Sequence, residues 1–204
     1  MLQQTQVPRV VPRFEAWMAR WPTVEALAAA SSSDVIRAWQ GLGYNRRAVN
    51  LHRAAQRVAG DGWPDDLTEL PGVGEYTAAA VRHFAFGEPV LPLDTNVRRV
   101  VERTGGSFGP ESAEALMDLG REVCLARVPR CPVCPLAAAC TSRGRRYEPL
   151  RKQSRFEGSF RQRRADTLRL VASGRSANLD PEALASLERD GLVEVHAGLA
   201  RLPR

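Results

Sequence analysis

Four cysteines stand close together past the middle of the chain, and the 204-residue sequence contains no others. They follow the pattern C-x6-C-x2-C-x5-C. Cysteines this close together are either metal ligands or disulfide partners. A zinc site usually repeats C-x2-C pairs about 12–20 residues apart, and only one such pair occurs here. The pattern therefore favours a [4Fe–4S] cluster held by Cys124, Cys131, Cys134 and Cys140.

A second candidate for chemistry is the aspartate in LDTNV, residues 93–97. Asp94 precedes a helical pattern formed by Val97, Val100 and Val101, so we expect it at or near a helix N-terminus. An aspartate in that place is most often only an N-cap. The helix dipole also stabilises negative charge there. An ionised Asp94, with Asn96 beside it, is therefore also a candidate functional carboxylate.

A glycine-rich turn, LPGVG at residues 70–74, lies between two apolar helical patterns. Gly72 and Gly74 can take positive φ there and leave the backbone around Val73 bare. Bare N–H groups at the start of a helix form a ready anion site, which a phosphate fits. The alternative is an ordinary turn between two helices.

The composition limits the classes of protein to which the chain can belong. With 44% hydrophobic residues, it can bury a core and form one large or two small domains. The formal net charge of +6 suggests a polyanionic partner, although many basic proteins bind none. No run of about 18 apolar residues occurs, so we expect no membrane span. No signal pattern opens the sequence, which favours a reducing, cytoplasmic setting and metal-bound cysteines.

Apolar periodicity and turn residues divide the chain into five segments. Residues 1–22 show helical spacing, and Pro8 and Pro12 should confine the regular helix to the residues after them or kink it. The tail has two helical patterns and then a hairpin pattern, which resembles a small winged-helix fragment. We expect an N-terminal helical segment at 1–22, a helical domain at 23–104, a cluster domain at 105–145, a basic linker at 146–164 and a small α/β tail at 165–204.

Together, LPGVGEYTAAAV, LDTNV and the cysteine spacing resemble the endonuclease III superfamily of base-excision DNA glycosylases. MLQQTQV at residues 1–7 and GLGY at residues 41–44 are similar to the adenine-specific mismatch glycosylases, the MutY type. The resemblance covers residues 1–145. It implies an all-α, two-lobed helix-hairpin-helix fold with an iron–sulfur loop. It also implies a monomer that hydrolyses the N-glycosidic bond of adenine mispaired with 8-oxoguanine or guanine in double-stranded DNA.

The resemblance also assigns DNA contacts. The N-terminal segment would touch the base opposite the target, and the GLGY loop would wedge into the base stack to help expel the adenine. The turn at residues 70–74 would grip backbone phosphates without reading sequence. In chain order, the contact candidates are Gln4, Thr5, Leu42, Tyr44, Gly72, Val73, Gly74, Asp118, Arg127 and Arg130. For Asp118 the plain alternative is a surface carboxylate.

Tyr76 separates two classes of glycosylase within this resemblance. Lyase-competent relatives carry a lysine in this position, whose amine attacks the sugar to form a Schiff base. A tyrosine cannot form one, so the chain resembles a monofunctional hydrolase with Tyr76, Asp94 and Asn96 at the reacting sugar. The family's catalytic glutamate directly precedes MLQQTQV, whereas the printed sequence begins at Met1. We therefore expect the 204-residue chain to be impaired and a form extended upstream to be active.

Two alternatives remain open on sequence alone. The first is a glycosylase/lyase acting on oxidised pyrimidines, against which Tyr76 and the LQQTQ stretch argue. The second is a non-catalytic, cluster-bearing DNA-binding protein. The segment at residues 104–118 is short, since the family carries about one more helix between the aspartate and the cysteines. This short segment and the glutamate missing before Met1 favour the second alternative.

Overall fold

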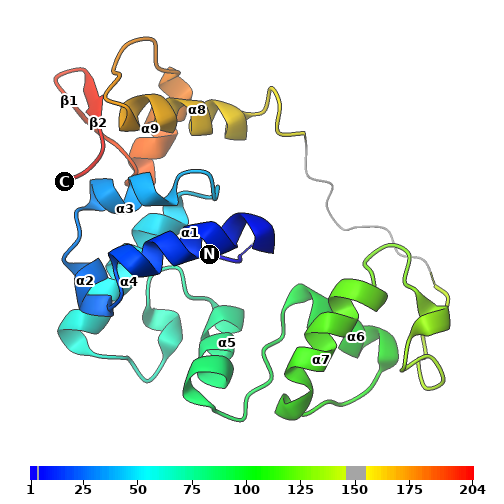
Figure 1. Cartoon of the computed structure of the whole chain (residues 1–204). Coiled ribbons are helices and arrows are strands. Elements are labelled where there is room, and N and C mark those ends of the chain that lie inside the picture. Colours follow the sequence, from blue (N-terminus) through cyan, green and yellow to red (C-terminus); the bar gives the residue numbers. More distant parts are fainter. Residues whose placement is uncertain (4, 146–154) are drawn as a thin grey trace. The chain divides into compact units, whose positions relative to one another are not determined.

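The computed structural model describes residues 1–3, 5–145 and 155–204, so that Gln4 and residues 146–154 of the predicted linker lie outside the described residues. The described part is mostly helical, which confirms the all-α prediction (Figure 1). The helices are α1 (Val7–Arg20), α2 (Val24–Ala28), α3 (Ser32–Trp39), α4 (Arg46–Asp61), α5 (Glu75–Phe86), α6 (Thr95–Thr104), α7 (Ala113–Asp118), α8 (Phe160–Ala172) and α9 (Pro181–Arg189). The strands are β1 (Glu194–His196) and β2 (Leu199–Arg201).

The chain forms two compact units. The first unit consists of Met1–Gly72 and Ser154–Arg204, and the second of Val73–Gln153. The N-terminal helices and the tail therefore belong to one unit, whereas the LDTNV helix and the cysteines belong to the other. The division between the units falls inside the LPGVG turn. The five segments expected from the sequence stay a prediction.

Three tryptophans form the centre of the helical core in the first unit. Trp17 packs edge-to-face on Trp21 and on Trp39, with ring centroids 4.7 and 5.7 Å apart. All three rings are buried. Because Trp39 ends α3, this core holds the residue from which the GLGY loop departs.

Helix α1 begins earlier than expected and buries only part of its apolar surface. It begins at Val7, ahead of both prolines, because Pro8 lies in the first turn, where no backbone N–H is needed. Pro12 lies inside the helix and removes one backbone hydrogen bond. The apolar stripe is also only partly covered, because one row of it remains exposed, namely Val7, Val11, Phe14 and Met18.

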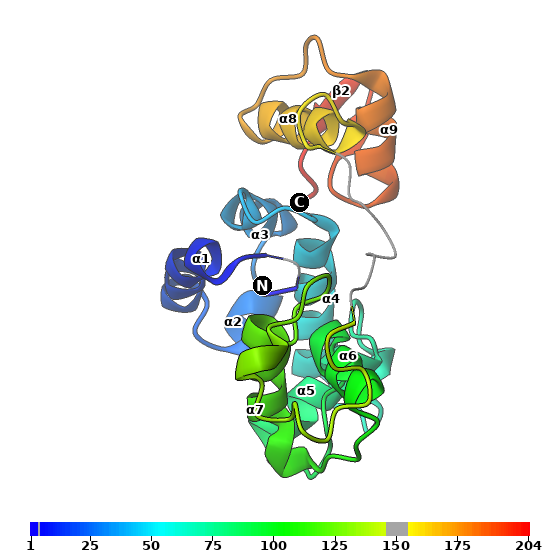
Figure 2. The same cartoon turned by 90° about the vertical axis from the view of Figure 1, so that its right-hand side faces the viewer.

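The tail packs against α3 and α4. Figures 1 and 2 show α8 and α9 beside α3 in both views. Ile36 of α3 is only 2% exposed, and it lies in the core of the tail instead of the tryptophan core. The other buried members of that core are Leu168, Val171, Leu187, Leu192, Val193, Ala200 and Leu202. An ion pair between Arg46 of α4 and Asp190, 3.7 Å long, lies at the same junction.

The predicted hairpin is present in the tail. β1 and β2 pair antiparallel, with Val195 opposite Ala200. Helix α8 starts at Phe160, earlier than the tail boundary expected at residue 165. The earlier start has a local cause, because the Ser159 hydroxyl accepts a hydrogen bond from the backbone N–H of Gln162.

Truncation of Ile36 to alanine should destabilise the whole first unit. Removing a fully buried isoleucine side chain costs about 2–5 kcal/mol, because a cavity remains. The matched control is Leu199→Ala, since Leu199 is an exposed apolar residue of the tail. Urea unfolding monitored by circular dichroism measures both variants. Equal effects of the two substitutions would mean that α3 does not hold the tail.

The second unit is built on α5, α6 and α7. Val97 and Val100 of α6 pack against Leu116 of α7, and all three are almost completely buried. Helix α6 ends at Gly105, whose φ of +67° forms a left-handed C-cap. A π-helical turn at Leu119–Val123 then leads into the first cysteine. No described helix combines the length and low polarity that crossing a membrane requires.

Candidate active site and nucleic-acid interface

Asp94 is the N-cap of α6, as predicted, and both of its carboxylate oxygens are held. Oδ1 accepts hydrogen bonds from the backbone N–H groups of Asn96, at 2.8 Å, and Val97, at 2.6 Å. Oδ2 accepts a hydrogen bond from the side-chain amide of Asn96, at 3.0 Å. These contacts orient the carboxylate at the positive end of the helix dipole. Asn96, predicted as its neighbour, thus fixes the orientation of Asp94.

Arg99 extends this arrangement to the cysteine loop. Its guanidinium donates to Oδ1 of Asn96 at 2.7 Å and to the carbonyl of Gly120 at 2.7 Å. Its Nε donates to the carbonyl of Cys124 at 2.8 Å. A continuous chain of hydrogen bonds therefore runs from the Asp94 carboxylate through Asn96 and Arg99 to the backbone of the first cysteine. Hydrogen bonds to a charged group are stronger than neutral ones, so this chain resists distortion.

Gly120 allows the close approach on which these contacts depend. A Cβ atom at Gly120 would lie 2.8 Å from Cβ of Asn96 and 2.9 Å from its carbonyl oxygen. Any side chain there would push the π-helical turn away from α6. Neither Arg99 nor Gly120 is predicted from the sequence. Arg99 carries a local signal, since it stands three residues after Asn96 on one helix face, whereas the contact of Gly120 is visible only in the fold.

Tyr76 lies on α5 within the electrostatic reach of Asp94. Burial raises the pKa of the Tyr76 phenol, and the negative charge of Asp94 raises it further. The side chain is still 39% exposed. At neutral pH the phenol is therefore a neutral hydroxyl that is partly accessible from solvent, and it can donate a hydrogen bond but cannot form a Schiff base.

All four cysteines line one pocket of the second unit. The pocket has about 400 Å³ of empty space, counting its opening to solvent. Its lining also includes Val100, Arg103, Thr104, Leu119, Val123, Pro129, Ala137, Ser142 and Arg143. The backbone N–H of Gly144 donates to Sγ of Cys131 at 3.3 Å. N–H donors of Gly144 and Arg103 are thus directed at two of the four sulfur atoms.

Arg103 ties the cysteine loop to α6. Its guanidinium donates to the carbonyls of Leu125, at 2.7 Å, and Ala126, at 2.6 Å, and approaches Sγ of Cys124 at 3.6 Å. The residue is 7% exposed. A buried arginine without hydrogen-bond acceptors would cost several kcal/mol, of the order of a broken buried ion pair. The loop supplies those acceptors, so Arg103 and the loop depend on each other.

The donor set and the pocket are compatible with an iron–sulfur cluster. Within residues 1–3, 5–145 and 155–204, no three side chains of Cys, His, Asp or Glu converge as they would around one ion. A four-iron cluster holds its thiolates farther apart, because the iron–sulfur cube lies between them. Four thiols around one pocket, with Arg103 directed at one of them, are compatible with that geometry.

Only one of the two glycines in the LPGVG turn takes the positive φ that both could adopt. Gly72 has φ of +78°, as expected, whereas Gly74 has φ of −99° and ψ of 177°. Gly74 is extended because it is the N-cap of α5. A Cβ at Gly72 would lie 2.8 Å from the side chain of Asn50, but a Cβ at Gly74 would meet nothing within 4 Å. Gly72 is therefore required by the fold, whereas Gly74 keeps a helix N-terminus open to solvent.

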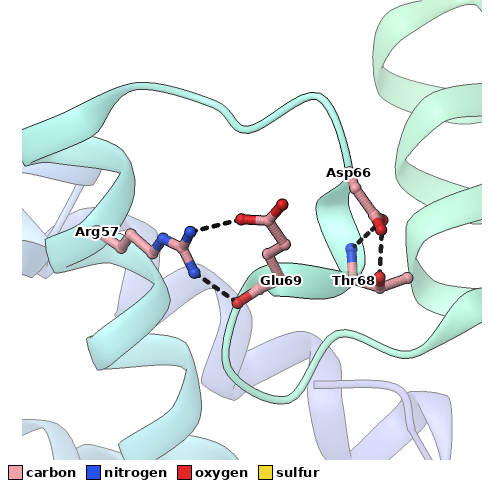
Figure 3. A network of polar contacts seen from close by, with 4 residues as sticks. All are labelled: Arg57, Asp66, Thr68 and Glu69. Carbon is pink, nitrogen blue, oxygen red and sulfur yellow. Dashed lines mark hydrogen bonds and ion pairs between the residues drawn. The ribbon is translucent and has the colours of Figure 1, made fainter.

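An arginine of α4 braces the segment that leads into the turn. Figure 3 shows Arg57 donating to the carbonyl of Glu69 at 2.8 Å and to its carboxylate at 2.6 Å. In the same view Asp66 accepts from the backbone N–H of Thr68 at 2.9 Å and from its hydroxyl at 2.7 Å. These contacts fix the short 3-10 turn Leu67–Glu69, so the position of the turn does not depend on apolar packing alone.

The two glycines should respond differently to alanine. Gly72→Ala should lower the free energy of unfolding by about 1–3 kcal/mol, because the positive φ and the Asn50 contact both oppose a Cβ. Gly74→Ala should leave stability within about 1 kcal/mol and weaken duplex binding, because the methyl group covers the open helix N-terminus. Thermal unfolding and fluorescence anisotropy with a labelled duplex measure the two effects. Equal loss of stability in both variants would contradict this distinction.

The GLGY loop presents only one of the two predicted side chains. Leu42 is 2% exposed in the tryptophan core, so its side chain cannot wedge into DNA in this conformation. Tyr44 is 47% exposed and has φ of +47°, which is rare for a tyrosine. The hydroxyl of Thr5 donates to the carbonyl of Leu42 at 3.1 Å. The structure thus brings Thr5 to the loop and turns Tyr44 outward.

The remaining predicted contacts lie on the surface of the second unit. Asp118 is exposed and pairs with Arg121 at 2.9 Å, as a surface carboxylate would. Arg127 and Arg130 are exposed in the loop between the first two cysteines. Gln4 lies outside the described residues. Within this unit Asp94 and Asn96 are in hydrogen-bond contact, and the charge of Asp94 acts on Tyr76.

The sequence is similar to DNA repair enzymes. The model of the HhH-GPD superfamily of base excision DNA repair proteins matches residues 1–124. An adenine DNA glycosylase of Mycolicibacterium smegmatis is 41% identical over 239 residues, with 95% of this chain and 81% of that protein covered. An adenine DNA glycosylase of Mycobacterium tuberculosis is 43% identical over 202 residues, 82% of this chain and 66% of that protein. The human adenine DNA glycosylase is 35% identical over 176 residues, 71% of this chain and 32% of that protein.

Solved structures share the fold. A thermostable thymine-DNA glycosylase aligns with a TM-score of 0.60 and 27% identity, over 69% of this chain and 79% of that chain. A trapped covalent intermediate of endonuclease III with DNA aligns with a TM-score of 0.60 and 26% identity, over 68% of this chain and 78% of that chain. The family match covers more than half of the chain and includes the turn, the Asp94 helix and the first cysteine. The chain therefore belongs to the HhH-GPD superfamily of base excision DNA repair proteins.

Proposed function

We propose that this chain is a monofunctional adenine DNA glycosylase, which hydrolyses the N-glycosidic bond of adenine opposite 8-oxoguanine or guanine. The observation that carries the proposal is the Asp94 carboxylate fixed at a helix N-terminus, with a tyrosine instead of a lysine at position 76, in a chain whose relatives are named adenine DNA glycosylases. A hydrolase needs the carboxylate, and a lyase would need an amine where Tyr76 stands. The thymine-DNA glycosylase with the same fold has only 27% identity, so it supports the fold more than the substrate.

In the proposed reaction, Asp94 stabilises the oxocarbenium-like sugar as the base departs. Glycoside hydrolysis generally uses two carboxylates, one for the cation and one as a general acid on the leaving group. Asp94 fits the first role, because its two oxygens are oriented and its charge lies at a helix N-terminus. Asn96 orients it, and the Tyr76 hydroxyl can donate to the sugar. The general acid is the glutamate that the resemblance places before MLQQTQV.

The proposed DNA contacts follow from exposed backbone and side chains. The N–H groups at residues 72–74 bind a phosphate, Tyr44 wedges into the base stack, and Arg127 and Arg130 contact phosphates. Thr5, and Gln4 by resemblance, contact the opposite base, whereas buried Leu42 only supports the loop. Asp118 near the adenine stays a prediction. Binding should weaken steeply as salt increases, because phosphate contacts release counterions. The monomeric state and the cytoplasmic setting are also part of the proposal.

We also propose that Cys124, Cys131, Cys134 and Cys140 hold a [4Fe–4S] cluster. The pocket lined by all four thiols supports this, as does the Arg103 guanidinium 3.6 Å from Sγ of Cys124. When bound, the cluster supplies a structural cross-link for the loop and no chemistry on the substrate. Arg99 and Arg103 then connect the loop to α6 through their hydrogen bonds to the loop backbone, and Asp94 is the N-cap of that helix.

A single-turnover assay of base release from an 8-oxoguanine:adenine duplex tests the function. It compares the 204-residue chain with a form extended to the next upstream in-frame start, and includes borohydride to trap a Schiff base. The expected result is that at least one of the two forms releases adenine and that neither gives a trapped adduct. A trapped adduct would support a glycosylase/lyase instead. Lesion binding by both forms without release by either would support a non-catalytic DNA-binding protein.

A further inference from the structure

We propose that Arg47 is a positioning residue. It holds the N-terminal segment (residues 1–3 and 5) and the GLGY loop (residues 41–44) in a fixed arrangement, so that both segments can contact DNA together. The inference rests on the proposed function, in which these two segments contact the opposite base and the base stack. Nothing in the amphipathic pattern of α4 distinguishes Arg47 from its basic neighbours. Its environment in the structure does.

The Arg47 guanidinium is bonded to both segments at once. One terminal nitrogen donates to the carbonyls of Met1, at 3.0 Å, and Gln3, at 2.7 Å. The other donates to the Thr5 hydroxyl at 2.9 Å and to the carbonyls of Leu42, at 3.3 Å, and Gly43, at 3.1 Å. Two stretches that are about forty residues apart in sequence therefore share one side chain as their hydrogen-bond donor.

The loop that Arg47 holds is conformationally costly. Gly41 and Gly43 have φ of +91° and +74°, and Tyr44 has φ of +47°. A tyrosine in the left-handed region costs about 1–2 kcal/mol, and such a residue persists only where surrounding contacts over-determine it. Arg47 supplies those contacts, because it binds the Leu42 and Gly43 carbonyls and stacks 5.6 Å from the Tyr44 ring centroid. The outward position of Tyr44 is thus coupled to the N-terminal segment.

Arg47 takes part in no ion pair within the described ranges, so its charge is balanced by carbonyl dipoles and aromatic rings. Burial lowers the pKa of its guanidinium. Its ring contacts are Tyr44 and Trp39, the latter at 5.2 Å, and the indole N–H of Trp39 donates to the same Gly43 carbonyl at 3.1 Å. Lysine would keep the charge but has one compact ammonium with three donors, which cannot span five acceptors on two segments.

The test uses Arg47→Lys, with Arg37→Lys as the matched control. Arg37 is an exposed arginine on α3. Backbone NMR order parameters report the mobility of both segments in the free protein. In Arg47→Lys they should fall in both segments together, and in Arg37→Lys they should not change. Binding to an undamaged duplex should stay within about twofold of the unsubstituted chain, because the charge is kept.

Lesion recognition should change far more. With 2-aminopurine in place of the target adenine opposite 8-oxoguanine, unstacking by the unsubstituted chain raises the fluorescence. Arg47→Lys should lose that rise, and its preference for the lesion duplex should fall about tenfold or more, as expected when several charged hydrogen bonds are lost. Unchanged order parameters with unchanged lesion preference would overturn the inference.

Two further outcomes are decisive. If Arg47→Lys does not fold, Thr5→Val replaces it, because valine removes only the hydroxyl that bridges Arg47 and Leu42. It should show the same changes to a smaller degree, and its failure to do so would overturn the inference. If the unsubstituted chain shows no lesion preference while Arg47→Lys loosens both segments, the proposed function fails and the positioning role stands.

Discussion

Asp94→Asn should slow adenine release by about 10²–10³-fold, measured by single turnover in a form of the chain that releases adenine. Asparagine caps helices about as well as aspartate, so stability should change by less than about 0.5 kcal/mol. It also keeps an oxygen for the N–H groups of Asn96 and Val97. The substitution therefore removes the negative charge and leaves the cap. Binding to the lesion duplex should persist.

The matched control for Asp94→Asn is Asp180→Asn. Asp180 caps α9 and accepts from the backbone N–H of Ala183 at 2.8 Å, far from the proposed chemistry in sequence. Its substitution should leave the release rate unchanged within about twofold. If Asp94→Asn released adenine as fast as the control, Asp94 would be a helix cap and nothing more.

Gly120→Ala should impair both stability and catalysis, although Gly120 touches no proposed substrate. The added methyl group would lie 2.8 Å from Cβ of Asn96, so the π-helical turn or the start of α6 must move. Such overpacking costs about 1–3 kcal/mol. Movement of Asn96 changes the orientation of Asp94, and movement of the Gly120 carbonyl releases Arg99. Urea unfolding and single-turnover base release measure the two consequences.

Gly60→Ala provides the comparison for Gly120→Ala. Gly60 lies near the end of α4, has no positive φ, and a Cβ there would meet nothing within 4 Å. Alanine should therefore stabilise the helix, by up to about 1 kcal/mol. If Gly120→Ala kept both the stability and the release rate of the unsubstituted chain, the close packing of Gly120 on Asn96 would not be needed for stability or catalysis.

The features that the sequence predicted correctly are local ones. The Asp94 cap depends on the residues immediately after it, and the positive φ of Gly72 depends on one tight turn. Gly74 is extended as the N-cap of α5, which the sequence did not reveal because a turn glycine and a helix N-cap glycine look alike. In each case the information lies within a few residues of the position concerned.

The features that the sequence could not give depend on contacts between distant segments. The sequence predicts an exposed Leu42 at the tip of the GLGY loop, but its side chain is buried in the tryptophan core. Ile36 belongs to the same helical pattern as Val35, yet the two residues enter different cores. Arg47 and Gly120 acquire their roles only from partners many residues away. Periodicity identifies the face that is buried, but not the segment that covers it.

The placement of Ile36 in the tail core has a consequence for protein synthesis. On the ribosome, α3 emerges early, but Leu202 follows 166 residues after Ile36 (202 − 36). At about 5–20 residues per second, translation of that stretch takes roughly 8–33 s. During this time an apolar face of α3 has no native partner, so the nascent chain presents a binding surface to chaperones until its last residues are made. Premature termination would leave that surface exposed permanently, and the truncated product would be prone to aggregation.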